Sequence, residues 1–241
     1  MDLLAFLSIG FFVGMGHALE ADHLAAVATM LQRQDGRQSL ILRGAIWGVG
    51  HTLSLFVICS AVVLLGLTVS GTVEAALELS VGIMILVLGA QVIWRLRRER
   101  MHIHAHEHDG VRHLHVHSHA ADTRPHAESA HRHAHGPFLA HRKALLIGLL
   151  HGAAGSAGLL VLMVASTQSA AGALTYFLVF GIGSILGMAA LSAVASYPLI
   201  AVQRGALWLR NATTAAIGAG AIWVGGHLAL ESLATLGVVG G

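Results

Sequence analysis

Residues Leu40–Leu67 read LILRGAIWGVGHTLSLFVICSAVVLLGL, and from Gly44 onward the stretch contains no Asp, Glu, Lys or Arg. A helix rises about 1.5 Å per residue, so roughly 20 apolar residues cross the hydrocarbon core of a bilayer. The stretch is therefore predicted to be a transmembrane helix. The whole chain agrees, because only 11% of its 241 residues are charged, whereas a soluble domain carries about 25%. Most of the surface is expected to face lipid.

The same apolar pattern recurs and predicts an all-α integral membrane protein with six transmembrane helices. The predicted spans are Leu3–Leu31, Leu40–Leu67, Glu74–Trp94, Ala144–Ser166, Ala171–Tyr197 and Trp208–Leu233. A polar segment follows the third span. The chain is thus expected to consist of residues 1–94 (a first transmembrane unit), 95–142 (a His-rich loop) and 143–241 (a second transmembrane unit).

Basic residues indicate the orientation. With Arg43 counted in the first loop, all 14 Lys and Arg residues lie in the first, third and fifth loops. Positively charged loops stay in the cytoplasm, so we expect a protein of the cell (inner) membrane with both termini outside. Trp47, Trp94 and Trp208 are expected at the cytoplasmic helix ends, as an interfacial belt. This placement explains the high isoelectric point without a nucleic-acid partner.

The two transmembrane units resemble each other. An odd number of helices per unit requires the second copy to be inverted, and inverted repeats in secondary transporters hold the substrate site near the bilayer midplane. The matches, at offsets of 134, 133 and 136 residues, are Gly14-Met-Gly-His17 with Gly148-Leu-Leu-His151, Gly48-Val-Gly50-His51 with Gly181-Ile-Gly183-Ser184, and Gly82 and Gly89 with Gly218 and Gly225.

Ionisable residues interrupt the first span at His17, Glu20, Asp22 and His23. A carboxylate within a bilayer costs several kcal/mol unless it is paired or hydrated, and Lys and Arg are expected only in the loops and at the ends of spans. The partner must be a histidine, a proton or an external cation. Imidazole and carboxylate are good ligands for divalent transition metals.

The spacing on a regular helix does not bring all four residues together. His17 and Glu20 share a face, whereas Asp22 and His23 point elsewhere. They converge only if the helix opens locally, as in the discontinuous helices of transporters, and neighbouring glycines favour such a break. Alternatively, His17 pairs with Glu20 while Asp22 orients His23.

Two further histidines, His51 and His151, lie near mid-depth among small residues. Either one alone would equally fit an interhelical hydrogen bond. Three such motifs at similar depth, with two unpaired carboxylates, favour a functional site. The predicted metal ligands are His17, Glu20, Asp22, His23, His51 and His151. His227, beside Glu231, is instead expected to have an interfacial structural role.

The third loop contains 13 of the 18 histidines, many at alternate positions between His102 and His135. His-rich tracts are typical of metal binding, and the alternation suggests a flexible multidentate chelator rather than a packed fold. We interpret the loop as a cytoplasmic sensor, buffer or delivery arm, outside the translocation site. A pH-responsive or merely low-complexity segment is the alternative.

The motif His17-x4-Asp22-His23 resembles that of the nickel/cobalt transporter family, with Glu20 where importers usually have Asp. The glycine-flanked His51 and His151 motifs look like those of its short six-helix branch, which includes members associated with urease accessory systems. The resemblance implies Ni(II) or Co(II) as substrate. Well-known importers in the family have eight helices and an Arg where Gly16 stands, and the His-rich loop is similar to that of the efflux branch. The direction of transport is therefore left open.

These observations together predict a secondary transporter that moves Ni(II) or Co(II) as a substrate, with no cofactor and no enzymatic activity. The sequence contains no Gly-x4-Gly-Lys-Ser/Thr motif for ATP binding. A membrane nickel sensor or metallochaperone that supports metalloenzyme maturation without transport is the main alternative, and a channel is another. A cytoplasmic metallochaperone or metalloenzyme system is the expected protein partner.

Overall fold

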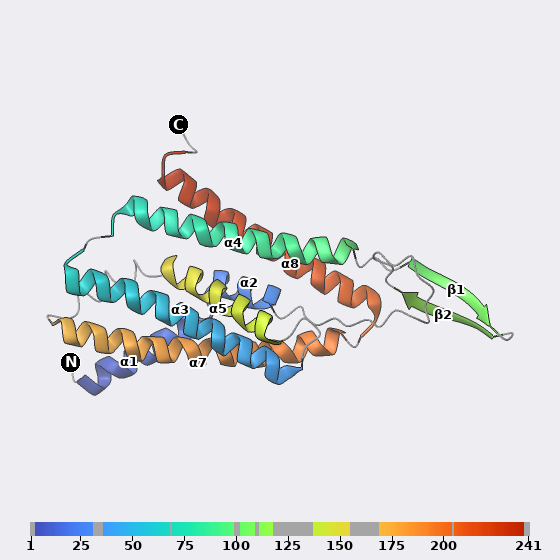
Figure 1. Cartoon of the computed structure of the whole chain (residues 1–241), viewed down its shortest axis with the longest axis horizontal. Coiled ribbons are helices and arrows are strands. Elements are labelled where there is room, and N and C mark those ends of the chain that lie inside the picture. Colours follow the sequence, from blue (N-terminus) through green and yellow to red (C-terminus); the bar gives the residue numbers. More distant parts are fainter. Residues whose placement is uncertain are drawn as a thin grey trace.

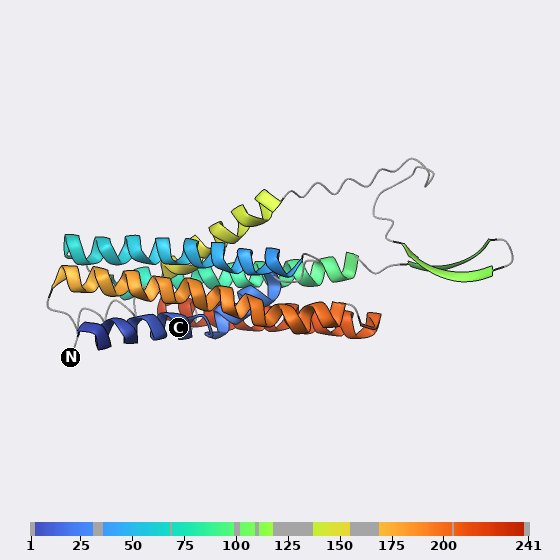
Figure 2. The same ribbon diagram turned by 90° about the horizontal axis from the view of Figure 1, so that it is seen from below.

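The computed structural model describes residues 3–30, 36–67, 69–98, 102–108, 111–117, 137–154, 169–203 and 205–238. Long helices lying side by side dominate the architecture in two perpendicular views (Figures 1 and 2). In chain order the elements are α1 (Leu3–His17), α2 (Ala21–Met30), α3 (Arg37–Leu65), α4 (Gly71–Arg98), β1 (His102–His108), β2 (Val111–His117), α5 (Pro137–Ala154), α7 (Ala170–Gln203) and α8 (Leu207–Thr235).

Four of the described helices, α3, α4, α7 and α8, are long and apolar enough to cross a membrane. The pair α1 and α2 adds a fifth span if the two are taken as one bent segment. The predicted fourth span lies only partly within the described residues, because α5 covers its first half and residues 155–168 are not described. A helical membrane protein is therefore confirmed, whereas the count of six helices stays a prediction.

The helices have apolar outer surfaces and bury polar and small residues beside large apolar ones, as expected for a protein surrounded by lipid. Large side chains such as Leu53, Val87 and Val194 are about half exposed or more. In contrast, two serines of α7, Ser184 and Ser192, are buried. The histidines of the transmembrane units are buried as well, with the exception of His227. Hydrophobic burial therefore does not by itself explain how the helices pack together.

Close helix packing depends on glycine. Helix α4 packs along α8, α3 packs against both α5 and α7, and α1 packs against α7. At Gly14 an added Cβ would collide with the carbonyl oxygen of Phe180, and at Gly148 with that of Trp47. Such contacts let two helix backbones approach each other, which is how small residues promote association in membranes.

The described basic residues gather mainly at one end of the bundle. The N-terminal ends of α3, α5 and α8 and the C-terminal end of α4 all lie at the end that carries the β-strands (Figure 1). These helix ends contain most of the described Lys and Arg residues, including Arg37, Arg97 and Lys143. The start of α1 and the end of α8 lie at the opposite end (Figure 1). This separation agrees with the alternation of basic loops in the sequence.

Part of the His-rich loop forms a β-hairpin, whereas the sequence suggested a flexible segment there; the described remainder of the chain is helical, as predicted. Strands β1 and β2 pair antiparallel, with His102 opposite His117, His104 opposite His115 and His106 opposite His113. Alternation of residues has a period of two, which is the period of a strand. Alternating histidines therefore do not indicate flexibility by themselves, because the same pattern is compatible with a paired strand.

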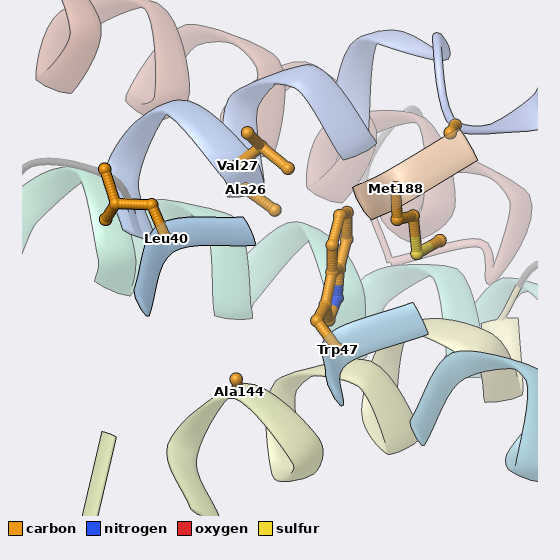
Figure 3. Close-up of a cluster of buried hydrophobic side chains, with 7 residues drawn as sticks. Ala26, Val27, Leu40, Trp47, Ala144 and Met188 are labelled. Atoms are coloured by element: carbon orange, nitrogen blue, oxygen red, sulfur yellow. The ribbon is translucent and has the colours of Figure 1, made fainter. Parts of the chain in front are cut away.

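Two residues assigned to the membrane boundary lie inside the protein. Arg43 was counted in the first loop, but it belongs to α3 and is buried, with 5% exposure. Trp47 was placed in an aromatic belt, but its side chain is fully buried in a cluster formed by α2, α3, α5 and α7 (Figure 3). Trp94 and Trp208, in contrast, are exposed at the basic end of the bundle.

Candidate metal-binding site

The first span is broken where its ionisable residues are. Helix α1 ends at His17 and α2 begins at Ala21, with an angle of 54° between them. The connection is a tight turn in which the amide of Leu19 donates to the carbonyl of Gly16 (2.9 Å) and that of Glu20 to the carbonyl of His17 (3.2 Å). This is the local opening that the sequence required for the four ionisable residues to converge. It places Asp22 and His23 beside His17, which a straight helix would not allow.

Four buried imidazole rings from four helices meet at this break. The ring of His23 (α2) lies 4.5 Å from that of His17 (α1), 5.1 Å from that of His51 (α3) and 4.1 Å from that of His151 (α5), centroid to centroid. Each of the four residues is less than 9% exposed. The structure therefore brings together all four histidines that the sequence singled out within the spans.

Asp22 connects two of the helices. One carboxylate oxygen accepts a hydrogen bond from Nδ1 of His23 (2.9 Å) and another from the His23 backbone amide (2.8 Å). The other oxygen accepts one from Nε2 of His151 (2.9 Å). The sequence predicted the pairing of Asp22 with His23, but it did not predict the contact with α5.

Glu20 forms a second carboxylate–histidine pair. Its Oε1 lies 2.6 Å from Nδ1 of His17, which donates the hydrogen bond. The Glu20 side chain is 56% exposed, whereas that of His17 is buried. The alternative arrangement derived from the sequence, with separate His17–Glu20 and His23–Asp22 pairs, thus occurs together with the break in the helix.

These hydrogen bonds to carboxylates determine which histidine ring nitrogens keep a lone pair that could bind a metal ion. A neutral imidazole that donates from one nitrogen has a lone pair on the other. The other nitrogens, Nε2 of His17, Nε2 of His23 and Nδ1 of His151, are buried without a hydrogen-bond partner among the described residues. Both ring nitrogens of His51 are likewise buried without a partner there. Unsatisfied buried polar atoms are rare in native proteins, so a cluster of them requires an explanation.

The spacing of these groups suits a cation. One ring nitrogen from each of His17, His23 and His51 lies within 4.8 Å of the others, and the same holds for one ligand atom from each of Asp22, His23 and His151. Nitrogen and carboxylate ligands bind divalent metals at about 2.0–2.2 Å, so ligand atoms on opposite sides of one ion are about 4 Å apart. Small rotations of the rings would complete such a site.

Two aromatic side chains that the sequence analysis did not assign to the site border it. The Trp47 ring lies 5.5 Å from that of His23 and 5.7 Å from that of His151, and the Phe180 ring lies 5.5 Å from that of His17. Trp47 precedes His51 by one helical turn, so the i, i+4 spacing on α3 was a signal that both residues share a face.

His227 lies away from this cluster. Its Nδ1 is 3.2 Å from Glu231 on α8, and both side chains are at least 60% exposed. This agrees with the expected structural pair near the end of the sixth predicted span.

Apolar spans around a broken helix and buried imidazoles are features of membrane transporters for metal ions. The comparison of sequences identifies the group of transporters. Residues 3–237 match the model of the NicO family, described as high-affinity nickel-transport protein, and the chain belongs to this family. It is accordingly a multi-pass membrane protein of a metal-transport family, with nickel as the family's transported substrate, and not a member of an enzyme family.

A curated relative supports the same assignment. The urease accessory protein UreH of Bacillus sp. (strain TB-90) is 31% identical over 204 residues, which are 82% of this chain and 79% of the relative. No solved structure matches the chain. The predicted resemblance to the nickel/cobalt transporter family and to its urease-accessory branch is thus confirmed, whereas cobalt as a substrate is not tested by these similarities.

Proposed function

We propose that the protein is a secondary transporter that binds Ni(II) within the bilayer through the imidazoles of His17, His23 and His51. Asp22, Glu20 and His151 complete the proposed site. The observation that carries this proposal is the set of buried imidazole nitrogens, gathered at a helix break, that have no hydrogen-bond partner among the described residues. A passing divalent cation would satisfy them. Co(II) is the other substrate that we propose, because imidazole and carboxylate ligands accept both metals.

Carboxylates contribute charge as well as hydrogen bonds. A divalent cation moving into a low-dielectric region is disfavoured by several kcal/mol unless negative charge offsets it. Asp22 and Glu20 supply two negative charges next to the imidazoles. Because each carboxylate accepts from a histidine N–H, it also holds the ring in the tautomer that a metal needs. Since the sequence lacks an ATP-binding motif, the energy is proposed to come from an ion gradient.

We further propose that the membrane region contains six helices in two inverted repeats, residues 1–94 and 143–241. Equivalent residues make equivalent contacts, which supports this arrangement. Gly14 approaches the carbonyl of Phe180, and the equivalent Gly148 approaches the carbonyl of Trp47. In the same way, Gly50 approaches the carbonyl of Leu145, and Gly183 approaches that of Phe11. Gly82 approaches Gly225, and Gly89 approaches Gly218. Each pair of contacts is related by the sequence offsets that suggested the repeat. A twofold relationship between the units would produce this pattern.

The orientation that we propose places the basic end of the bundle and the His-rich loop (residues 95–142) in the cytoplasm, and both termini outside. The segregation of Lys and Arg to the helix ends near the hairpin supports it. In this orientation the loop receives or supplies metal on the cytoplasmic side, as a sensor, buffer or delivery arm.

The function is tested by flux of Ni(II), Co(II) and Zn(II) into sealed proteoliposomes that contain the purified protein. We expect saturable Ni(II) flux that depends on an ion gradient. A second candidate function, delivery of nickel to a metalloenzyme without transport, is supported by the name of the urease accessory relative. Stoichiometric Ni(II) binding with no flux under any gradient would favour that candidate. Flux that rises linearly with concentration would indicate a channel.

A further inference from the structure

Two buried aromatic side chains lie on opposite sides of the histidine cluster. Trp47 on α3 is 0% exposed, and Phe180 on α7 is 1% exposed. Helix α3 starts at the basic end of the bundle, so Trp47, one turn before His51, lies toward that end (Figure 1). Helix α7 instead finishes near the start of α8 at the basic end, so Phe180, in its first half, lies toward the opposite end (Figure 1). The cluster therefore has one aromatic residue on each side along the length of the bundle.

The two aromatic residues are equivalent in the proposed repeat. Phe180 follows Trp47 by 133 residues, which is the offset that relates the glycine motifs of α3 and α7. Their histidine neighbours correspond as well. The ring of Trp47 lies 5.7 Å from that of His151. The ring of Phe180 lies 5.5 Å from that of His17, the equivalent histidine of the first unit. The repeat thus places an aromatic ring at both ends of one site.

Each ring belongs to a packed apolar layer on its own side of the cluster. Trp47 packs in a buried cluster with Leu40 and Val27 toward the basic end (Figure 3). Phe180 packs in a separate buried cluster that includes Leu55, which follows the site on α3. Close-packed apolar side chains leave no space for water, and apolar constrictions stop ions because they do not hydrate. Both layers are therefore closed to a cation in the structure.

The backbone beside each aromatic residue is held against another helix. An added Cβ at Gly148 of α5 would collide with the carbonyl oxygen of Trp47, and one at Gly14 of α1 with that of Phe180. These contacts leave no slack between the two backbones of either pair. Opening of a layer therefore requires the ring to rotate away, or α5 to separate from α3 at one end and α1 from α7 at the other.

We propose that Trp47 and Phe180 are the two gates of the metal site, an inference that rests on the proposed passage of a substrate through that site. In the proposed orientation, the Trp47 ring closes the site toward the cytoplasm and the Phe180 ring closes it toward the outside. Metal enters or leaves when one ring and its layer move aside while the other stays in place. Equivalent gates at the two ends of one site are what alternating access by two inverted repeats requires.

The accessibility of a cysteine between the gates tests this proposal without any metal. Ser184 on α7 is fully buried. It lies one turn after Phe180 and one turn before Met188, a residue of the Trp47 cluster. In a Cys59→Ser background, Ser184→Cys provides the only thiol of the full-length chain. A cationic, membrane-impermeant methanethiosulfonate reagent labels this thiol from the outside in right-side-out membrane vesicles and from the cytoplasmic side in inside-out vesicles.

The gates are then removed one at a time, with Trp47→Ala or Phe180→Ala. Each substitution should raise the labelling rate by about 10-fold or more from one side only, because it leaves a cavity in one apolar layer and labelling follows the population of open molecules. We expect Trp47→Ala to act from the cytoplasmic side and Phe180→Ala from the outside. The matched control is Ile85→Ala, an equally buried side chain that faces Gly225 of α8, which should leave both rates unchanged.

Trp47→Phe and Phe180→Leu keep most of the side-chain volume, so smaller one-sided increases in these variants support the gates even if an alanine variant does not fold. An exchange of the two sides would retain the gates and reverse the proposed orientation. One-sided labelling without Ni(II) flux would retain the gates and refute the proposed substrate. Equal increases from both sides in a single variant would overturn the proposal. No increase in any gate variant would also overturn it, and would indicate access at the helix break, where Glu20 and Asp22 are partly exposed.

Discussion

Replacing Asp22 with Asn tests how the proposed site holds its histidines. The native carboxylate accepts hydrogen bonds from both His23 and His151. An amide has only one acceptor oxygen, so if that oxygen remains on His23, the NH2 group faces Nε2 of His151. That nitrogen must then accept, and the proton of His151 moves to Nδ1, the atom that was available to a metal. The substitution thus removes a charge and a lone pair while almost preserving the shape of the side chain.

The expected loss of Ni(II) affinity follows from the two histidine hydrogen bonds that Asp22 accepts. Loss of one outer hydrogen-bond partner of a metal-binding histidine typically lowers metal affinity 10- to 100-fold. Because Asp22 serves two histidines, we expect Ni(II) to bind at least about 100-fold more weakly, or about 2.7 kcal/mol, and flux at low Ni(II) concentration to disappear.

Calorimetric titration of Ni(II) into the detergent-solubilised protein measures this loss, with circular dichroism to verify folding. Glu231→Gln is the matched control, because it alters a carboxylate–histidine pair that is exposed on α8. The reasoning would be refuted if Asp22→Asn folds and its Ni(II) affinity stays within about 3-fold of that of the native protein. Such a change is well below the 10-fold minimum expected for the loss of a single hydrogen-bond partner.

Three other expectations concern single features. Glu20→Gln keeps an oxygen that can accept a hydrogen bond from His17, and it changes an exposed side chain. The Ni(II) affinity of this variant should therefore fall by about 10-fold or less in the same titration. A larger loss than in Asp22→Asn would contradict the greater role assigned to Asp22. Gly14→Ala should lower stability by about 1–3 kcal/mol through overpacking against Phe180. Gly16→Ala should be neutral or stabilising by up to about 1 kcal/mol, because an added Cβ would meet no other element within 4 Å in the described part of the chain. Equal unfolding midpoints of these two variants would contradict the proposed packing. Deletion of residues 102–135 should change the rate or apparent affinity of flux but leave flux measurable, and complete loss would show that the loop is essential.

Much of the helical architecture could be predicted from the sequence because membrane spans have a strong signature. The described helices α3, α4, α7 and α8 agree with the predicted spans to within a few residues, except at the C-terminal end of α7. That helix continues to Gln203, past Pro198. Proline disrupts the interior of a helix in water, but a bundle can tolerate it within a transmembrane helix.

Side-chain burial was harder to predict than the spans. Arg43 and Trp47 both lie near the predicted end of a helix, where the positive-inside rule and the aromatic belt place such residues at the surface. Both are instead directed into the protein, because α3 is surrounded by α2, α5 and α7. The hairpin was missed for a related reason, since histidine composition suggests a function but has little preference for a strand.

The candidate site shows where local sequence stops being informative. The break between His17 and Ala21 was one of two arrangements that the sequence left open, because the four ionisable residues converge only if the helix opens. The bond from Asp22 to His151 was not, because it joins residues 129 positions apart. Only the approach of α5 to α3, allowed by Gly148 and Gly152, brings His151 to the break.

The proposed repeat relates His17 to His151 and His51 to Ser184, yet the two units do not contribute equally to the site. The first supplies His17, Glu20, Asp22, His23 and His51, and the second supplies His151. A single Asp22 carboxylate joins the two units by accepting from a histidine of each. Any movement of α5 relative to α2 therefore stretches or breaks the bond to His151 and alters the proposed ligand set. If alternating access consists of one unit moving against the other, metal affinity must change during that movement, which is what release of a tightly bound substrate requires.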